Sequence, residues 1–245
     1  MKYLVCSSAV GDCITLAPAA CYLANEHGAI TFVVSEALKE NVSSFFLSDP
    51  RVKVATVNEI NRTHEVQSVQ NGSEPLNKNF YWCGLHRHPS IPSSNEEPWA
   101  MWFYRQLGIP FKCRWDFCPI AKSSKMVYQT PWPEGVSFLH DDRERGINIR
   151  LFTNPVRFQR VFNEKGSMLQ YAQAIENAPE IHVIDSSFYH LTECLNPTGK
   201  LFLHRYARFY CPGFHDIPAR HKWEIIDDPL FREQANLILM LRGAM

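Results

Sequence analysis

A polar run that follows a short apolar stretch in the second half of the chain has the residue types of an anion-binding turn. The apolar residues Ile181–Ile184 predict a buried strand, and Asp185, Ser186, Ser187 and His190 follow it as a turn and the start of a helix. Serine is a preferred helix-capping residue, and the free N–H groups at a helix N-terminus attract anions. The run therefore predicts a phosphate-binding turn for a nucleotide-linked ligand. The alternative is an ordinary helix cap beside a half-buried histidine.

Basic residues follow two further predicted strands of this half. His140, Arg143 and Arg145 come after the strand Val136–Leu139, and Arg205 comes after another strand. Ligands of parallel sheets bind at the carboxyl ends of the strands, and the planar fork of arginine suits two phosphate oxygens at once. We expect these side chains to neutralise a diphosphate or, for Arg205, to contact a base or a phosphate. A solvated charged loop is the alternative for each cluster.

Two positions in the first half are candidates for contacts to a second substrate. Asp12 follows Gly11 in the turn after the first predicted strand, which would aim its carboxylate at a ligand; the alternative is that it only caps the following helix. His86 and His88 lie in a long irregular segment, where an acceptor sugar could dock. Zinc is the other interpretation of these histidines, but no further ligand stands at a suitable spacing.

Strand and helix patterns alternate along the chain, which predicts an α/β fold with parallel sheets and helices on both faces. In the first half we expect elements at residues 2–6, 14–25, 29–34, 36–46, 52–57 and 99–107, with an irregular excursion over 58–98. In the second half we expect them at residues 136–139, 147–151, 168–177, 181–184, 188–195 and 200–204. Prolines in 122–135 indicate a connection, so we place two Rossmann-like domains at 1–121 and 122–245. A last helix over 229–241 could pack back on the first domain.

Two segments resemble the heptosyltransferase-like glycosyltransferases. Gly11–Pro18 is similar to the family's Gly-Asp turn, and the spacing onward to Asp49–Val52 also agrees. Asp185–Leu191 is similar to the family's donor motif, in which Asp-Thr-Gly is followed by His-Leu. The chain departs from the family by having Ser187 in place of glycine, by being short, and by lacking the lysine before the donor motif. Arg143, Arg145 or Arg150 would have to take the place of that lysine.

The resemblance implies a GT-B architecture, in which two Rossmann-like domains face a cleft. It further implies transfer of a sugar from a nucleotide-diphosphate sugar to a glycan or lipid-linked acceptor, inverting and without a metal or other cofactor. Asp12 would be the catalytic base, and Gly11, His86 and His88 would lie on the acceptor side. The diphosphate would be held by the residues of the second half, namely Asp185, Ser186, Ser187, His190, His140, Arg143, Arg145 and Arg205.

Two other functions remain open on the same fold. One is a nucleotide-sugar epimerase or hydrolase, and the other is a non-catalytic module that binds a nucleotide or a sugar. Product analysis without an acceptor would identify the first, and tight binding without turnover would identify the second.

Composition limits the partners and the compartment. The chain has 25 Lys and Arg against 25 Asp and Glu residues, so it has no overall field to hold nucleic acid. It contains no run of about 18 apolar residues, so we expect a cytoplasmic protein with at most peripheral membrane contact. The 8 cysteines form no C-x-x-C pair, which favours buried thiols over disulfides or zinc.

Overall fold

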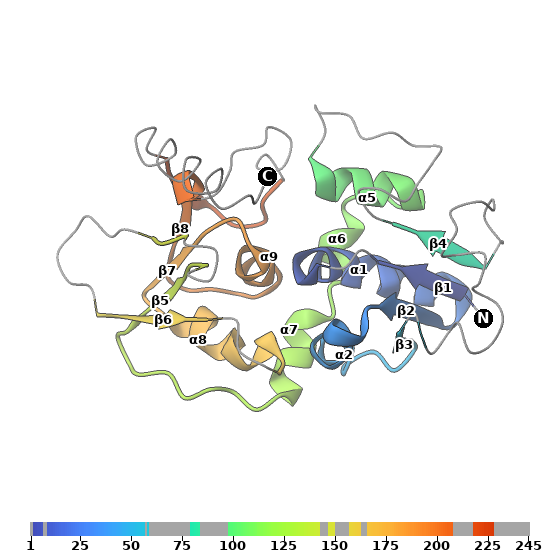
Figure 1. Cartoon of the computed structure of the whole chain (residues 1–245), viewed down its shortest axis with the longest axis horizontal. Coiled ribbons are helices and arrows are strands. Elements are labelled where there is room, and N and C mark those ends of the chain that lie inside the picture. The colour runs from blue at the N-terminus through green and yellow to red at the C-terminus, as the bar shows by residue number, and fades with distance from the viewer. Residues whose placement is uncertain are drawn as a thin grey trace. The chain divides into compact units, whose positions relative to one another are not determined.

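The chain forms two compact units, Met1–Val127 and Tyr128–Met245, each built around one parallel sheet (Figure 1). The computed structural model describes residues 2–6, 9–56, 58, 79–83, 98–142, 147–149, 157–162, 166–207 and 218–227. The sequence-based expectation of an α/β protein with parallel sheets is confirmed.

The first unit contains a four-stranded sheet in the order β3-β2-β1-β4. All three strand pairings are parallel. The chain moves outward from β1 to β2 and β3, and then returns to the other side of β1 to form β4. The direction of travel therefore reverses between β1 and β4. The strands are β1 (Lys2–Val5), β2 (Ile30–Val34), β3 (Val52–Thr56) and β4 (Phe80–Trp82).

Buried apolar residues place the helices of this unit against the sheet. The long helix α1 buries most residues from Cys13 to Ala24, and it ends at Gly28, whose φ of 82° suits glycine. Gly108 ends α5 in the same left-handed region, with φ 67°. The helices are α1 (Val10–His27), α2 (Lys39–Phe45), α5 (Trp99–Leu107), α6 (Cys113–Asp116) and α7 (Ile120–Ser123), with 3-10 turns η1 (Glu36–Leu38) and η2 (Ser124–Met126).

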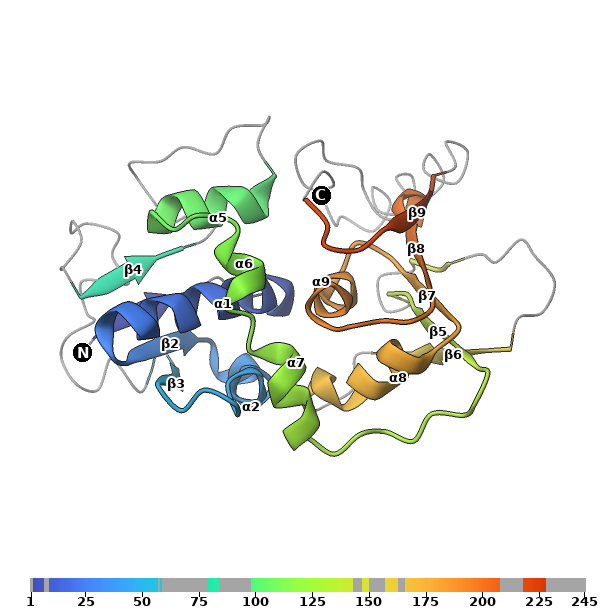
Figure 2. The ribbon, with the colours of Figure 1, turned by 180° about the vertical axis from the view of Figure 1, so that it is seen from behind.

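The second unit contains a five-stranded parallel sheet in the order β6-β5-β7-β8-β9. Here the chain direction reverses between β5 and β7. On one face the rings of Phe138, Tyr171 and Phe188 pack together, which holds η3 and α9 on the sheet. Figure 2 shows α8 and α9 next to the strands of this unit. The elements are β5 (Ser137–His140), β6 (Phe158–Val161), η3 (Met168–Tyr171), α8 (Ala172–Asn177), β7 (Glu180–Val183), α9 (Ser187–Cys194), β8 (Lys200–His204), η4 (Arg205–Ala207) and β9 (Trp223–Ile226).

Several expected elements differ from the structure. The excursion expected over 58–98 contains the short strand β4. Of the strand expected over 147–151, residues 147–149 are described, and among these only Ile147 forms an isolated bridge, with Asp142. The edge strands of the second sheet are β6 and β9, and neither was expected from the sequence. The first helix begins at Val10, so Gly11 and Asp12 lie in its first turn rather than in the preceding loop. The helix expected over 229–241 lies outside the described residues.

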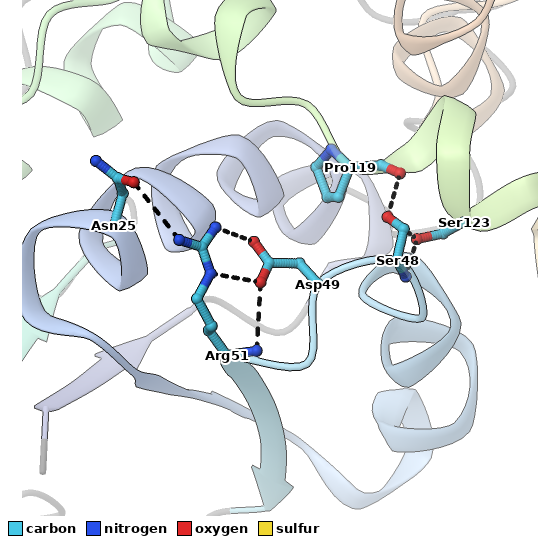
Figure 3. A network of polar contacts seen from close by, with 6 residues as sticks. All are labelled: Asn25, Ser48, Asp49, Arg51, Pro119 and Ser123. Carbon is cyan, nitrogen blue, oxygen red and sulfur yellow. Dashed lines mark hydrogen bonds and ion pairs between the residues drawn. The ribbon is translucent and has the colours of Figure 1, made fainter.

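The segment expected to begin the interdomain connection belongs to the first unit. The hydroxyl of Ser123 in α7 donates to the carbonyl of Phe45 at 2.8 Å. It accepts from the backbone N–H of Ser48 at 3.0 Å (Figure 3). The Ser48 hydroxyl also donates to the carbonyl of Pro119. These bonds tie α7 to the end of α2, and the compact unit extends to Val127 rather than to residue 121.

The described cysteines are free thiols, as expected from the sequence. Six are buried, Cys118 is partly exposed, and Cys211 lies outside the described residues. Within the described ranges, no helix has the length and apolar character needed to cross a bilayer.

Candidate functional site

Asp12 lies at the reversal point of the first sheet. It is the third residue of α1, whose N-cap is Ala9, so Asp12 is not the N-cap residue. Cys6 directly follows β1 and Cys83 directly follows β4, and the charge of Asp12 contributes to the raised pKa of both thiols. The carboxylate is therefore near the carboxyl ends of the two strands between which the chain reverses. Ligands of open α/β sheets bind at this point.

Burial changes the acidity of Asp12. Loss of solvent around the partly exposed side chain raises the pKa of its carboxyl from 3.8 to about 7. The surrounding thiols are apolar neighbours: Cys6 and Cys13 are buried, and their Sγ atoms are 3.6 Å apart. A carboxylate whose pKa lies near neutral pH can accept a proton from a hydroxyl far better than an ordinary aspartate.

His140 and Ser186 meet at the reversal point of the second sheet. His140 is the last residue of β5, and Ser186 follows β7 as the N-cap of α9. The Ser186 Oγ lies 3.2 Å from Nδ1 of His140, and the imidazole packs on the Phe188 ring with centroids 4.2 Å apart. Because the Ser186 hydroxyl bonds His140, it does not cap the helix. The backbone N–H groups in the first turn of α9 are therefore not capped by this side chain, which suits an anion.

The other predicted donor residues of this unit lie along the same carboxyl edge. Asp185 is partly exposed in the turn between β7 and α9, and Ser187 is the first residue of α9. His190 is buried one turn further on. Arg205 directly follows β8 and begins η4. The structure thus brings Asp185, Ser186, Ser187, His190, His140 and Arg205 to the ends of three adjacent strands, β5, β7 and β8.

Five predicted residues lie outside the described part of the chain: Arg143, Arg145, Arg150, His86 and His88. The two ends of the segment that carries Arg143 and Arg145 are described. Asp142 and Ile147 exchange backbone hydrogen bonds of 3.0 and 2.8 Å. This bridge closes a short loop directly after β5. Gly11 is the second residue of α1, next to Asp12.

Sequence reasoning missed the role of Asp141. The buried Asp141 pairs with Arg160 of β6 and accepts the N–H of Ile149 at 3.2 Å. No signal in the sequence connects Asp141 with Arg160. In the described ranges, no three His, Cys, Asp or Glu side chains are arranged to hold a metal ion.

A second missed feature is a row of hydrogen-bonded side chains between β7 and β8. His182 Nδ1 lies 3.0 Å from His204 Nε2, and His204 Nδ1 lies 3.2 Å from the Tyr206 hydroxyl. Burial lowers the pKa of His182, and it lowers the pKa of His204 to about 3. Both imidazoles are therefore neutral at neutral pH. The polar residues at alternate positions of two apolar strands were the signal in the sequence.

Known proteins resemble this chain in structure but not in sequence. No family model and no curated protein matches the sequence. The Escherichia coli heptosyltransferase WaaC with ADP is 14% identical with a TM-score of 0.53, over 100% of this chain and 99% of WaaC. TibC, an iron-containing dodecameric glycosyltransferase of enterotoxigenic E. coli, is 12% identical with a TM-score of 0.53, over 100% of this chain and 76% of TibC. The expected likeness to heptosyltransferases is thus confirmed for the fold.

Proposed function

We propose that this chain is a glycosyltransferase that moves a sugar from a nucleotide-diphosphate sugar to a glycan or lipid-linked acceptor. Asp12 is the general base, and the carboxyl edge of the second sheet holds the diphosphate. The fold is that of heptosyltransferases whose structures contain ADP, and TibC has also been solved with ADP-D-beta-D-heptose. ADP and ADP-linked sugars are therefore the first ligands to test.

The observation that carries this proposal is the carboxyl of Asp12, with a pKa of about 7, beside the reversal point of the first sheet. A carboxylate that only stabilises the start of a helix would not need a raised pKa. It would be more stabilising as a fully ionised carboxylate, because the N-terminal end of a helix attracts negative charge. A base for a sugar hydroxyl needs a carboxylate that gains proton affinity from its surroundings.

The donor edge supplies groups that match a diphosphate. The backbone N–H groups in the first turn of α9 point toward the N-terminal side of that helix. Arg205 adds a cationic group directly after β8, and His190 adds a polar group one turn into α9. Ser186 is held by His140, so its position is fixed before the ligand arrives. Fixed donors stabilise the negative charge that grows on the leaving diphosphate.

The reaction that these groups support is a single displacement. The acceptor hydroxyl gives its proton to Asp12 as its oxygen bonds to the anomeric carbon. The bond from that carbon to the diphosphate oxygen breaks, and the nucleoside diphosphate leaves with the electron pair. Attack from the face opposite the leaving group inverts the anomeric carbon. Metal independence is part of the proposal, and transfer should persist after treatment with EDTA.

Ligand-induced thermal shifts test the donor site. We expect a nucleoside diphosphate to raise the melting temperature, because it binds only the folded state. Ser186→Ala and His190→Gln should each reduce that shift, measured against the variant's own melting temperature without ligand. His27→Ala serves as the control, since His27 is exposed in the first unit, and its shift should equal that of the wild type. No shift with any nucleotide would contradict the proposal.

A further inference from the structure

A second carboxylate, Glu36, lies at the carboxyl edge of the first sheet. Glu36 begins η1 two residues after β2, and Thr56 is the last residue of the neighbouring strand β3. The Thr56 hydroxyl donates to Glu36 Oε1 at 2.5 Å. Thr56 is fully buried, whereas Glu36 is exposed. A buried donor thus orients a solvent-facing carboxylate.

Strand register places Glu36 and Asp12 on the same edge. Val5 of β1 pairs with Val33 of β2, and Val34 pairs with Thr56 of β3. Neighbouring strands lie about 4.8 Å apart, so the positions after β1, β2 and β3 follow one another at roughly that spacing. Along this edge, the end of β1 near Asp12 and the end of β2 before Glu36 are therefore about one or two strand spacings apart.

The chemistry of Glu36 favours one class of ligand. A carboxylate accepts hydrogen bonds and donates none when ionised, and bonds from hydroxyl groups to it are short and strong. The Thr56 hydroxyl donates to Oε1, and among the described residues no group donates a hydrogen bond to Oε2. A sugar hydroxyl can therefore bond Oε2. An anionic group at this point would be repelled by both carboxylates.

We propose that Glu36, oriented by Thr56, binds hydroxyl groups of the acceptor sugar and selects an acceptor that carries no negative charge at this point. The proposal rests on the glycosyltransferase function proposed above and gives that function its acceptor class. Glu36 binds the substrate that Asp12 deprotonates, while Thr56 is a positioning residue that acts through Glu36.

Two acceptor probes that differ only at one carbon test this proposal. Methyl glucoside carries a neutral hydroxymethyl group where methyl glucuronide carries a carboxylate. Binding of each glycoside is measured by saturation-transfer NMR in the presence of ADP, and KM and kcat are measured with ADP-heptose as the donor. We expect the wild-type protein to prefer the neutral glycoside by about tenfold or more, which is about 1.4 kcal/mol.

The variants separate charge from orientation. Glu36→Gln should raise KM for the neutral glycoside about tenfold with little change in kcat, and should reduce the preference over the glucuronide. Thr56→Val keeps the charge but removes the orienting hydroxyl, so it should raise KM for the neutral glycoside and retain the discrimination against the glucuronide. Glu40→Gln, which changes another exposed carboxylate of the same region, should behave as the wild type.

The outcomes distinguish this proposal from the function on which it rests. Equal KM values for the wild type and Glu36→Gln would overturn the role of Glu36. So would failure of the wild type to bind either glycoside while ADP still raises its melting temperature, and in that case the donor site would stand. Absence of an ADP shift would instead contradict the glycosyltransferase function itself.

Discussion

At Asp12, the raised proton affinity of the carboxyl opposes the stability of the folded protein. Burial raises the pKa of its carboxyl to about 7, whereas the ordinary value is 3.8. In the unfolded chain the carboxyl ionises freely, so between these two pH values the unfolded state binds fewer protons than the folded state. Stability is therefore lost as the pH rises through this window. The proton affinity that suits a base thus destabilises the fold at neutral pH.

Replacing Asp12 should therefore stabilise the protein while it removes activity. We expect Asp12→Asn to have the same stability as the wild type near pH 4 and to gain stability progressively up to about pH 7, then to hold that gain. The gain should be a few kcal/mol at most, because one pKa unit corresponds to about 1.4 kcal/mol. Urea unfolding across this pH range measures it. A variant less stable than the wild type above neutral pH would indicate that Asp12 is a structural residue.

His204 gives the opposite dependence on pH. Burial, and next the neighbouring His182, lower the pKa of His204 from 6.5 to about 3. The unfolded chain gains this proton below about pH 6.5 and the folded chain does not, so stability is present above that pH and is lost as the pH falls toward 3. The groups facing the pair are the Tyr206 hydroxyl and the carboxylates of Glu180 and Glu224.

A substitution isolates this contribution from the general loss of stability in acid. His204→Leu should lower stability at neutral pH, because it leaves His182 and Tyr206 without their shared partner. As the pH falls from neutral to 4, the stability of His204→Leu should decrease less steeply than that of the wild type. Identical slopes for His204→Leu and the wild type would show that His204 does not titrate as inferred.

At the level of elements, the end of α2 depends on a small polar network. Ser123 in α7 bonds both Phe45 and Ser48, and Asp49 forms an ion pair with Arg51 at 2.7 Å. Figure 3 shows the bond to Ser48 and the ion pair. The hydroxyl of Ser123 is buried, whereas Arg51 is exposed. A buried bond that is lost leaves its partners unsatisfied, whereas an exposed ion pair is screened by solvent.

This difference predicts unequal effects of two small changes. Ser123→Ala should lower the free energy of unfolding by about 1–3 kcal/mol, since the Phe45 carbonyl and the Ser48 N–H lose a partner. Ser124→Ala removes a bond to the carbonyl of Ala121 within the same short helical segment and should cost less. Both variants should bind ADP as the wild type does. Equal losses of stability would show that the bonds of Ser123 do not hold α7 in place.

The central strands could be predicted from the sequence, and most of the edge strands could not. Strands β1, β2, β5 and β7 are almost wholly buried, so their continuous apolar runs are recognisable. The edge strand β6 exposes Phe158 and Gln159, and β9 is also largely exposed. Such strands are stabilised by pairing with a neighbour rather than by their own burial, so their residues carry little pattern. The same holds for β4, which has only three residues.

The site could be predicted where a motif carries it, but not where a distant contact defines it. Asp185, Ser186 and His190 lie close together in sequence, so the pattern of a strand followed by a helix was enough to place them after β7; their role as a site stays a prediction. Their contact with His140 depends on β5 and β7 being adjacent, which no local pattern reveals. The bond from Thr56 to Glu36 joins two strands in the same way. The pKa of Asp12 depends on burial and could not be derived from the sequence.

At the level of the whole molecule, each unit has its own candidate site at the reversal point of its own sheet. This division predicts where ligands protect the backbone from hydrogen exchange. ADP should slow exchange in the first turn of α9 and after β5, and a neutral glycoside should slow exchange after β1 and β2. Protection of the first turn of α1 by ADP alone, without any effect at α9, would reverse the proposed assignment of the two units.

The most direct test of the account is the activity and nucleotide binding of Asp12→Asn, measured side by side. The substitution keeps the size of the side chain and removes its ability to accept the acceptor proton as a carboxylate. We predict that transfer from ADP-heptose falls by about 100-fold or more, while the ADP-induced thermal shift equals that of the wild type. Transfer at the wild-type rate would contradict the account, because Asp12 could then not be the base.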